Sequence, residues 1–150
     1  GFHSASDSHY AWPEFGEMIG GYFNRHPWHQ KVTVKLDEPQ HDLLSAFDGK
    51  SFEVTDEIYQ FKDPYSRDKL RVLLSIDNSS IDVGKGIRED KDYAVAWIHP
   101  HGKGRVFYSS LGHREEIYWN PAVMKFYLDG IQYALGDLDV DDAPSVQSHP

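Results

Sequence analysis

The chain has 150 residues, a formal net charge of −9 and no cysteine, and its length suits a single domain with a hydrophobic core. The acidic balance argues against nucleic acid or an anionic membrane as a partner, because phosphate contacts need clustered lysine and arginine, and no apolar run approaches the roughly 20 residues of a membrane span. The absence of cysteine excludes disulfides, a thiolate nucleophile and cysteine-ligated zinc.

Hydrophobic spacing and turn residues predict the elements of the chain. In order, they are a loop at 1–11, a helix at 12–23, a His-rich connector at 24–30, strands at 31–36, 52–61, 71–76, 94–98 and 105–109, and a helix at 121–135. The strand at 71–76 is continuously apolar, which is typical of burial on both faces. The strands at 94–98 and 105–109 flank a Pro- and Gly-rich turn, which predicts a hairpin. Capping residues mark both ends of the last helix: Asn120 and Pro121 at its start and Gly136 after its end.

Polar residues interrupt one of these strands and follow another. Asp56 and Glu57 break an apolar pattern beside Tyr59, and acidic side chains in a strand must reach solvent, a partner or a ligand. An edge strand with solvated side chains explains them as well as a general acid or base at the rim of a pocket. His113 follows the carboxyl end of the strand at 105–109, where open α/β sheets place their ligands. Its alternative role is to cap the turn.

The remaining histidines show no strong metal-binding spacing. Pairs such as His26 and His29 are interpreted as loop residues. Glu115, two residues after His113, would suit a His–carboxylate pair of a catalytic triad. The sequence offers no Gly-x-Ser-x-Gly elbow for the nucleophile of such a triad.

Several short motifs, in order along the chain, resemble one known family. They are Gly1-Phe2-His3-Ser4-Ala5-Ser6, Tyr10-x-Trp12, Gly20-Gly21-x-Phe23-x-x-His26-Pro27, Asp56-Glu57-x-Tyr59, the run from Trp97 to His113, and Tyr133-Ala134-Leu135-Gly136. Together they resemble the ThuA-like, trehalose-utilisation family. The resemblance divides the chain into a ThuA-like domain at 1–138, similar to the C-terminal portion of the family domain, and an acidic, Pro- and Ser-containing tail or linker at 139–150.

The resemblance implies an α/β fold, a three-layer flavodoxin-like sandwich related to class I glutamine amidotransferases, without its N-terminal β-α units. In that fold an elbow carries a nucleophilic cysteine and a later strand end carries the catalytic histidine. By position, His3 resembles the elbow residue and His113 the later histidine. Because the chain has no cysteine, glutaminase activity is not implied. We therefore expect His3 and His113 to lie close together across one pocket, with Asp56, Glu57 and Tyr59 on its rim.

The leading hypothesis is an enzyme of carbohydrate metabolism that acts on a sugar or an oxidised sugar derivative. Its acid–base chemistry, with or without a divalent metal, would be carried by His3, Asp56, Glu57, Tyr59 and His113. The expected partner is a small-molecule carbohydrate, and the sequence leaves the compartment open.

The alternative is a non-catalytic carbohydrate-binding or interaction module. Its aromatic side chains would stack on sugar rings, and the candidates are Trp12, Trp97 and Trp119, with Trp28 beside them. A third hypothesis is a His-rich metal-binding protein. The burial expected for the strand at 71–76 also predicts that two helices are too few to cover the sheet. We expect missing upstream sequence, or another copy in a homo-oligomer, to cover the rest.

Overall fold

The computed structural model describes residues 1–145, which form a five-stranded sheet and two α-helices. The strands are β1 (Tyr22–Leu36), β2 (Phe52–Lys62), β3 (Arg71–Ile76), β4 (Ala94–His101) and β5 (Gly104–Ser109), and the helices are α1 (Pro13–Ile19) and α2 (Pro121–Leu135). Within this range, no helix combines the length and the apolar character that a membrane crossing needs.

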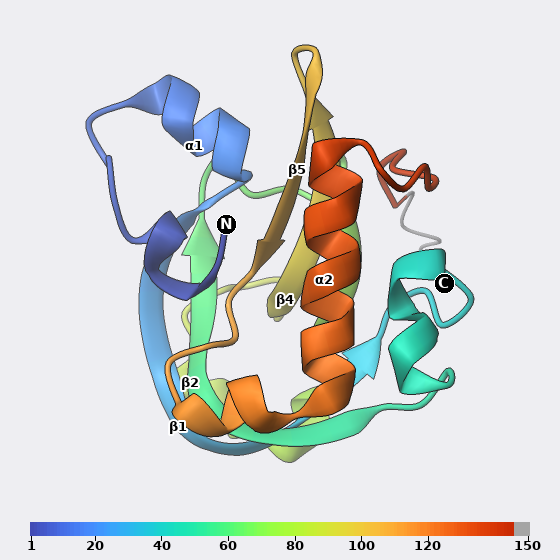
Figure 1. Ribbon diagram of the computed structural model, residues 1–150. Helices are drawn as coiled ribbons and strands as arrows, with labels where there is room; N and C mark the ends of the chain where they lie inside the picture. The colour runs from blue at the N-terminus through green and yellow to red at the C-terminus, as the bar shows by residue number, and fades with distance from the viewer. Residues whose placement is uncertain (146–150) are drawn as a thin grey trace.

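The sheet has the order β2-β1-β3-β4-β5, and every neighbouring pair is antiparallel (Figure 1). The predicted three-layer, flavodoxin-like α/β sandwich is therefore wrong, and the fold is mixed α+β. Parallel neighbours need a crossover of about a dozen residues or more, usually a helix. Here a tight hairpin through Gly102, with a φ of 59°, joins β4 to β5. Loops and 3-10 segments join the other consecutive strands. β2 follows β1 and β4 follows β3 as antiparallel neighbours, whereas β3 lies on the other side of β1 from β2.

Both helices begin and end where the backbone chemistry allows it. In α2 the Asn120 side chain accepts hydrogen bonds from the first free amides, Pro121 occupies the first turn, and Gly136 ends the helix with a φ of 86°. The prediction for residues 121–135 is confirmed. The first helix is shorter than predicted because Gly20, with a φ of 92°, ends it.

The two helices cover opposite faces of the sheet. Neighbouring residues of a strand point to opposite faces. In β5, Phe107 packs in the hydrophobic cluster that includes α2, whereas Tyr108 packs in the cluster that includes Ile19 of α1. Trp97 of β4 joins the second cluster, and its indole N–H donates to the Ile19 carbonyl at 2.9 Å. β3 is buried nearly throughout, as its apolar run predicted.

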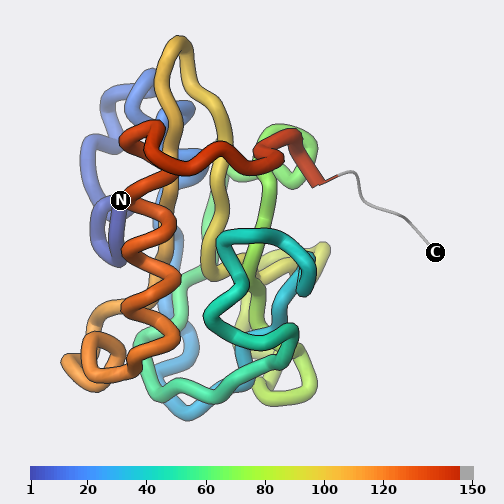
Figure 2. The backbone as a smooth tube through the Cα atoms, turned by 45° about the vertical axis from the view of Figure 1, so that its right-hand side comes forward, coloured from blue at the N-terminus to red at the C-terminus, as the bar shows by residue number. Residues whose placement is uncertain are grey.

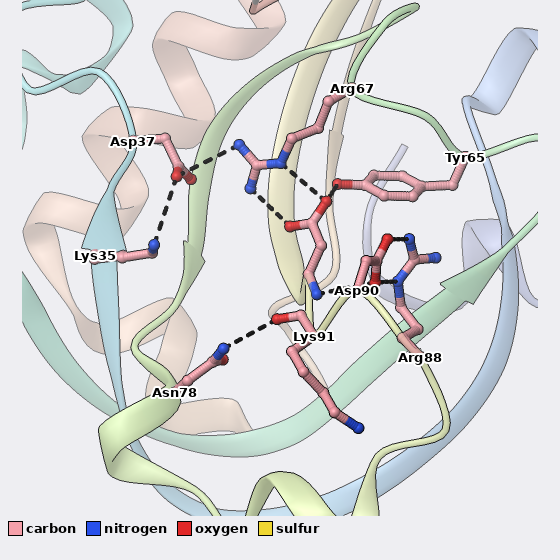
Figure 3. A network of polar contacts seen from close by, with 9 residues as sticks. Lys35, Asp37, Tyr65, Arg67, Asn78, Arg88, Asp90 and Lys91 are labelled. Atoms are coloured by element: carbon pink, nitrogen blue, oxygen red, sulfur yellow. Dashed lines mark hydrogen bonds and ion pairs between the residues drawn. The ribbon is translucent and has the colours of Figure 1, made fainter. Parts of the chain in front are cut away.

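A polar network joins the loops that flank β3 (Figure 3). Arg67 donates two hydrogen bonds, of 2.9 and 2.8 Å, to the Asp92 carboxylate, and the Tyr65 hydroxyl donates to the same group at 2.6 Å. Asp37, just after β1, lies 3.5 Å from Arg67, and burial raises the pKa of its carboxyl group. The network therefore holds half-buried charges of both signs in one fixed arrangement.

The segment after α2 runs back across the molecule, as Figure 2 shows in dark red. The Nε2 atom of His41 lies 2.9 Å from the carbonyl oxygen of Asp141, and the Ser145 hydroxyl donates to Glu38 at 2.7 Å. Residues 146–150 of the predicted tail lie outside the described residues. The earlier part of the tail lies against the loop that follows β1.

Candidate functional site

The adjacent residues Asp56 and Glu57 point to opposite faces of β2, because side chains alternate along a strand. On the side of Asp56, Ile58 packs in the cluster beneath α2; on the side of Glu57, Tyr59 packs in the cluster beneath α1. Asp56 is fully buried, whereas the side chain of Glu57 remains 13% exposed. The two carboxylates therefore lie in different environments, although the sequence presents them as one pair.

Glu57 lies among three imidazoles. Its Oε2 atom is 3.4 Å from Nε2 of His3 and 3.4 Å from Nδ1 of His113, and its Oε1 atom is 3.3 Å from Nδ1 of His26. We call Glu57, His3, His26 and His113 the Glu57 cluster. The side chains of His26 and His113 are 51% and 45% exposed, whereas that of His3 is only 15% exposed. The cluster thus presents two imidazoles to solvent beside one half-buried carboxylate.

His3 lies in a 3-10 segment, His3–Ser6, and has a left-handed φ of 41°. Its Nδ1 atom is 2.8 Å from the carbonyl oxygen of Ser110. Because a carbonyl only accepts, Nδ1 carries the proton, and in the neutral imidazole Nε2 keeps its lone pair. The Tyr59 hydroxyl donates to this lone pair at 3.1 Å. Burial, and then the charge of Glu57, raise the pKa of Tyr59, so its hydroxyl stays protonated.

His113 is held by a loop that Asp56 fixes from beneath. The Gly112 amide donates to Oδ2 of Asp56 at 2.7 Å, and the Arg114 amide donates to Oδ1 at 2.9 Å. The residue between them, His113, is therefore placed by its own backbone neighbours. Its ring centroid lies 5.4 Å from that of His3, which confirms the predicted proximity of the two imidazoles.

Sequence reasoning missed His26 and His29, because Pro27 between them predicted a connector rather than a strand. β1 instead runs through this segment with irregular register before Trp28. His29 pairs directly opposite Glu57 in the β1–β2 ladder, and its ring packs edge-on against His113 with centroids 5.1 Å apart. These two histidines could be placed near Glu57 only from the register between β1 and β2, which the sequence of one chain does not give.

The four candidate sugar-stacking residues divide into two groups. Trp97 is fully buried and Trp28 is 1% exposed, so neither presents a ring face to a ligand. Trp12 and Trp119 are 54% and 67% exposed. Trp119 ends the 3-10 segment Glu115–Trp119, which follows His113. The structure thus leaves two of the four rings accessible for stacking.

Comparison with known proteins places this fold in a family. The family model described as "Trehalose utilisation" (ThuA) matches residues 1–134. A ThuA-like protein from Bacteroides uniformis ATCC 8492 has a similar solved structure, with a TM-score of 0.69 and 24% identity. The match covers 89% of this chain and 56% of that one, so this chain spans little more than half of that protein's length. A search of curated proteins found no match. By the family match over residues 1–134, the chain belongs to the ThuA family.

Proposed function

We propose that the Glu57 cluster performs acid–base chemistry on a sugar or an oxidised sugar derivative. The observation that carries the proposal is a single half-buried carboxylate with three imidazole nitrogens within 3.4 Å. Imidazoles oriented by a carboxylate are the commonest proton-transfer groups at neutral pH, because their ordinary pKa lies near 6.5. Membership of the ThuA family supports carbohydrate metabolism as the setting.

The two oxygens of Glu57 define two sides of the site. On the Oε1 side, His26 is oriented by the carboxylate and half exposed, so it is suited to remove a proton from a substrate carbon next to a carbonyl. The carboxylate stabilises the imidazolium that forms. On the Oε2 side, His113 and His3 face the position where an electrophilic group would stabilise the developing negative charge on the carbonyl oxygen. The product of this step is an enol or enediol, whose reprotonation completes an isomerisation or an exchange.

Deuterium exchange tests this proposal. Simple keto-sugars incubated with the protein in D2O should lose the proton signal of the carbon next to the carbonyl, as measured by NMR. Glu57→Gln should slow this exchange by about a hundredfold or more, which is the usual contribution of general acid–base groups. Glu53→Gln is the matched control, because Glu53 lies on the same strand, is 60% exposed and pairs with Lys31. Equal exchange in Glu57→Gln and the wild type would contradict the proposal.

The second candidate is a non-catalytic carbohydrate-binding module. The exposed rings of Trp12 and Trp119 favour it, because sugars stack on accessible aromatic faces. In that case Trp12→Ala and Trp119→Ala would weaken sugar binding, whereas His113→Ala would leave most of it intact and no sugar would be turned over. In the acid–base proposal His113→Ala abolishes turnover.

A further inference from the structure

We infer that the Glu57 cluster binds a divalent cation through Nε2 of His3, Oε2 of Glu57 and Nδ1 of His113. This inference deepens the proposed function, on which it rests, by naming the electrophilic group on the Oε2 side. One ligand atom from each of these three residues lies within 4.8 Å of the others. Two imidazoles and one carboxylate form a donor set that catalytic zinc sites use, with the fourth position left to water or substrate.

The spacing around Oε2 suits a metal ion better than hydrogen bonds. The two nitrogen–oxygen distances of 3.4 Å exceed the roughly 2.7–2.9 Å of a charged hydrogen bond. A tetrahedral ion with bonds of about 2.1 Å separates its ligands by about 3.4 Å. The two imidazole nitrogens, at most 4.8 Å apart, must approach each other slightly. His113 is half exposed and follows Gly112, so its ring has room to make that movement.

The surroundings fix the ligands for metal binding. The hydrogen bond from Nδ1 of His3 to the Ser110 carbonyl turns Nε2 toward Glu57, which is the usual support of a metal-bound histidine. A bound ion would replace the Tyr59 hydroxyl as the partner of the Nε2 lone pair. The backbone on both sides of His113 is held by the buried carboxylate of Asp56. Two of the three ligands therefore have their own supporting groups before any ion arrives.

Charge favours a cation at the same place. Among residues 1–145, the ion-pair partners of Glu57 are all imidazoles. The guanidinium of Arg114, the residue next to His113, instead pairs with Glu116 at 3.1 Å. A half-buried carboxylate without a permanent cationic partner is stabilised by a bound metal ion. An ion at Oε2 would polarise a substrate oxygen as a Lewis acid and leave His26 on the Oε1 side to move the proton.

Cobalt binding tests the inference directly. The full chain, treated with a chelator and then dialysed, is titrated with Co²⁺ while visible absorption and heat are recorded. We expect one equivalent to bind with the intense absorption of a low-coordinate site. His3→Ala, Glu57→Gln and His113→Ala should each weaken binding by about a hundredfold or more, because each removes one of three ligands. His101→Ala, which removes an exposed imidazole outside the cluster, should bind cobalt like the wild type.

Two results would overturn the inference: no cobalt binding, or binding that the three cluster variants leave unchanged. Folding of each variant is checked by circular dichroism, and Tyr59→Phe provides a further test because it keeps all three ligands and must retain cobalt binding. The outcome separates this inference from the proposed function. If cobalt does not bind and keto-sugar exchange persists, the cation is refuted while the acid–base proposal stands. If cobalt binds and no sugar exchanges, the cation site stands and the acid–base proposal is refuted.

Discussion

Replacing Asp56 by alanine removes the acceptor of two backbone amides, those of Gly112 and Arg114, from a fully buried position. Each orphaned buried amide costs about 1–3 kcal/mol. The loop that carries the two amides is partly solvated, so hydrogen bonds to water offset part of this cost. Removing the buried carboxylate also removes the cost of its desolvation. We therefore expect Asp56→Ala to lower the free energy of unfolding by about 2–4 kcal/mol, a large share of the roughly 5–15 kcal/mol of a typical domain.

The matched variant is Glu57→Gln, one residue away on the other face of β2. Its side chain is partly exposed and keeps the same shape, so we expect a change below about 1 kcal/mol. Urea unfolding followed by tryptophan fluorescence measures both values. Asp56→Ala should lose both stability and the activity of the Glu57 cluster, because His113 loses its support, whereas Glu57→Gln should lose activity alone. An Asp56→Ala variant within about 0.5 kcal/mol of the wild type would refute this reasoning.

Burial lowers the pKa of His99 below its ordinary value of 6.5. As the pH falls, His99 therefore takes up its proton at a higher pH in the unfolded chain than in the folded one, and the free energy of unfolding decreases below pH 6.5. His99→Gln should flatten this fall in urea midpoints between about pH 7.5 and 5. Gly130→Ala would place a methyl group 2.5 Å from the Phe107 ring, so the melting temperature should fall despite the better helix propensity of alanine, and a rise would contradict the packing. Arg67→Met leaves the Asp92 carboxylate half-buried without its bidentate partner; we expect a loss of about 2–3 kcal/mol in urea unfolding, partly recovered by adding Asp92→Asn.

Local signals in the sequence predicted most elements but not how the strands run relative to one another. The capping residues Asn120 and Gly136 located α2, and the apolar run 71–76 located β3, because these signals act within a few residues. The parallel sandwich was inferred from the resemblance alone. The hairpin predicted between residues 94–98 and 105–109 already pointed to antiparallel pairing, because a tight turn can join only antiparallel neighbours.

The candidate site was predictable only in part for the same reason. His3, Glu57 and His113 stood out through motifs and strand ends, and the structure brings them together. Asp56 and Glu57 have different environments because neighbouring side chains of β2 point to opposite faces of the sheet. His26 remained hidden because a proline beside it suggested a break, whereas the irregular register of β1 absorbs that proline and keeps the ring near the carboxylate.

The anchoring of His3 has a consequence for how the site forms. The bond from its ring to Ser110 closes a loop of 107 residues, and the Tyr108 hydroxyl donates to the His3 carbonyl at 2.7 Å across a similar separation. Contacts between such distant positions are slow to form, because the entropy of loop closure opposes them until much of the chain is ordered. The antiparallel ladders need no contribution from His3. Detachment of the first turn would therefore remove one ligand of the cation site while leaving the pairing of the five strands in place, so ligand binding depends on the ends of the chain being held together.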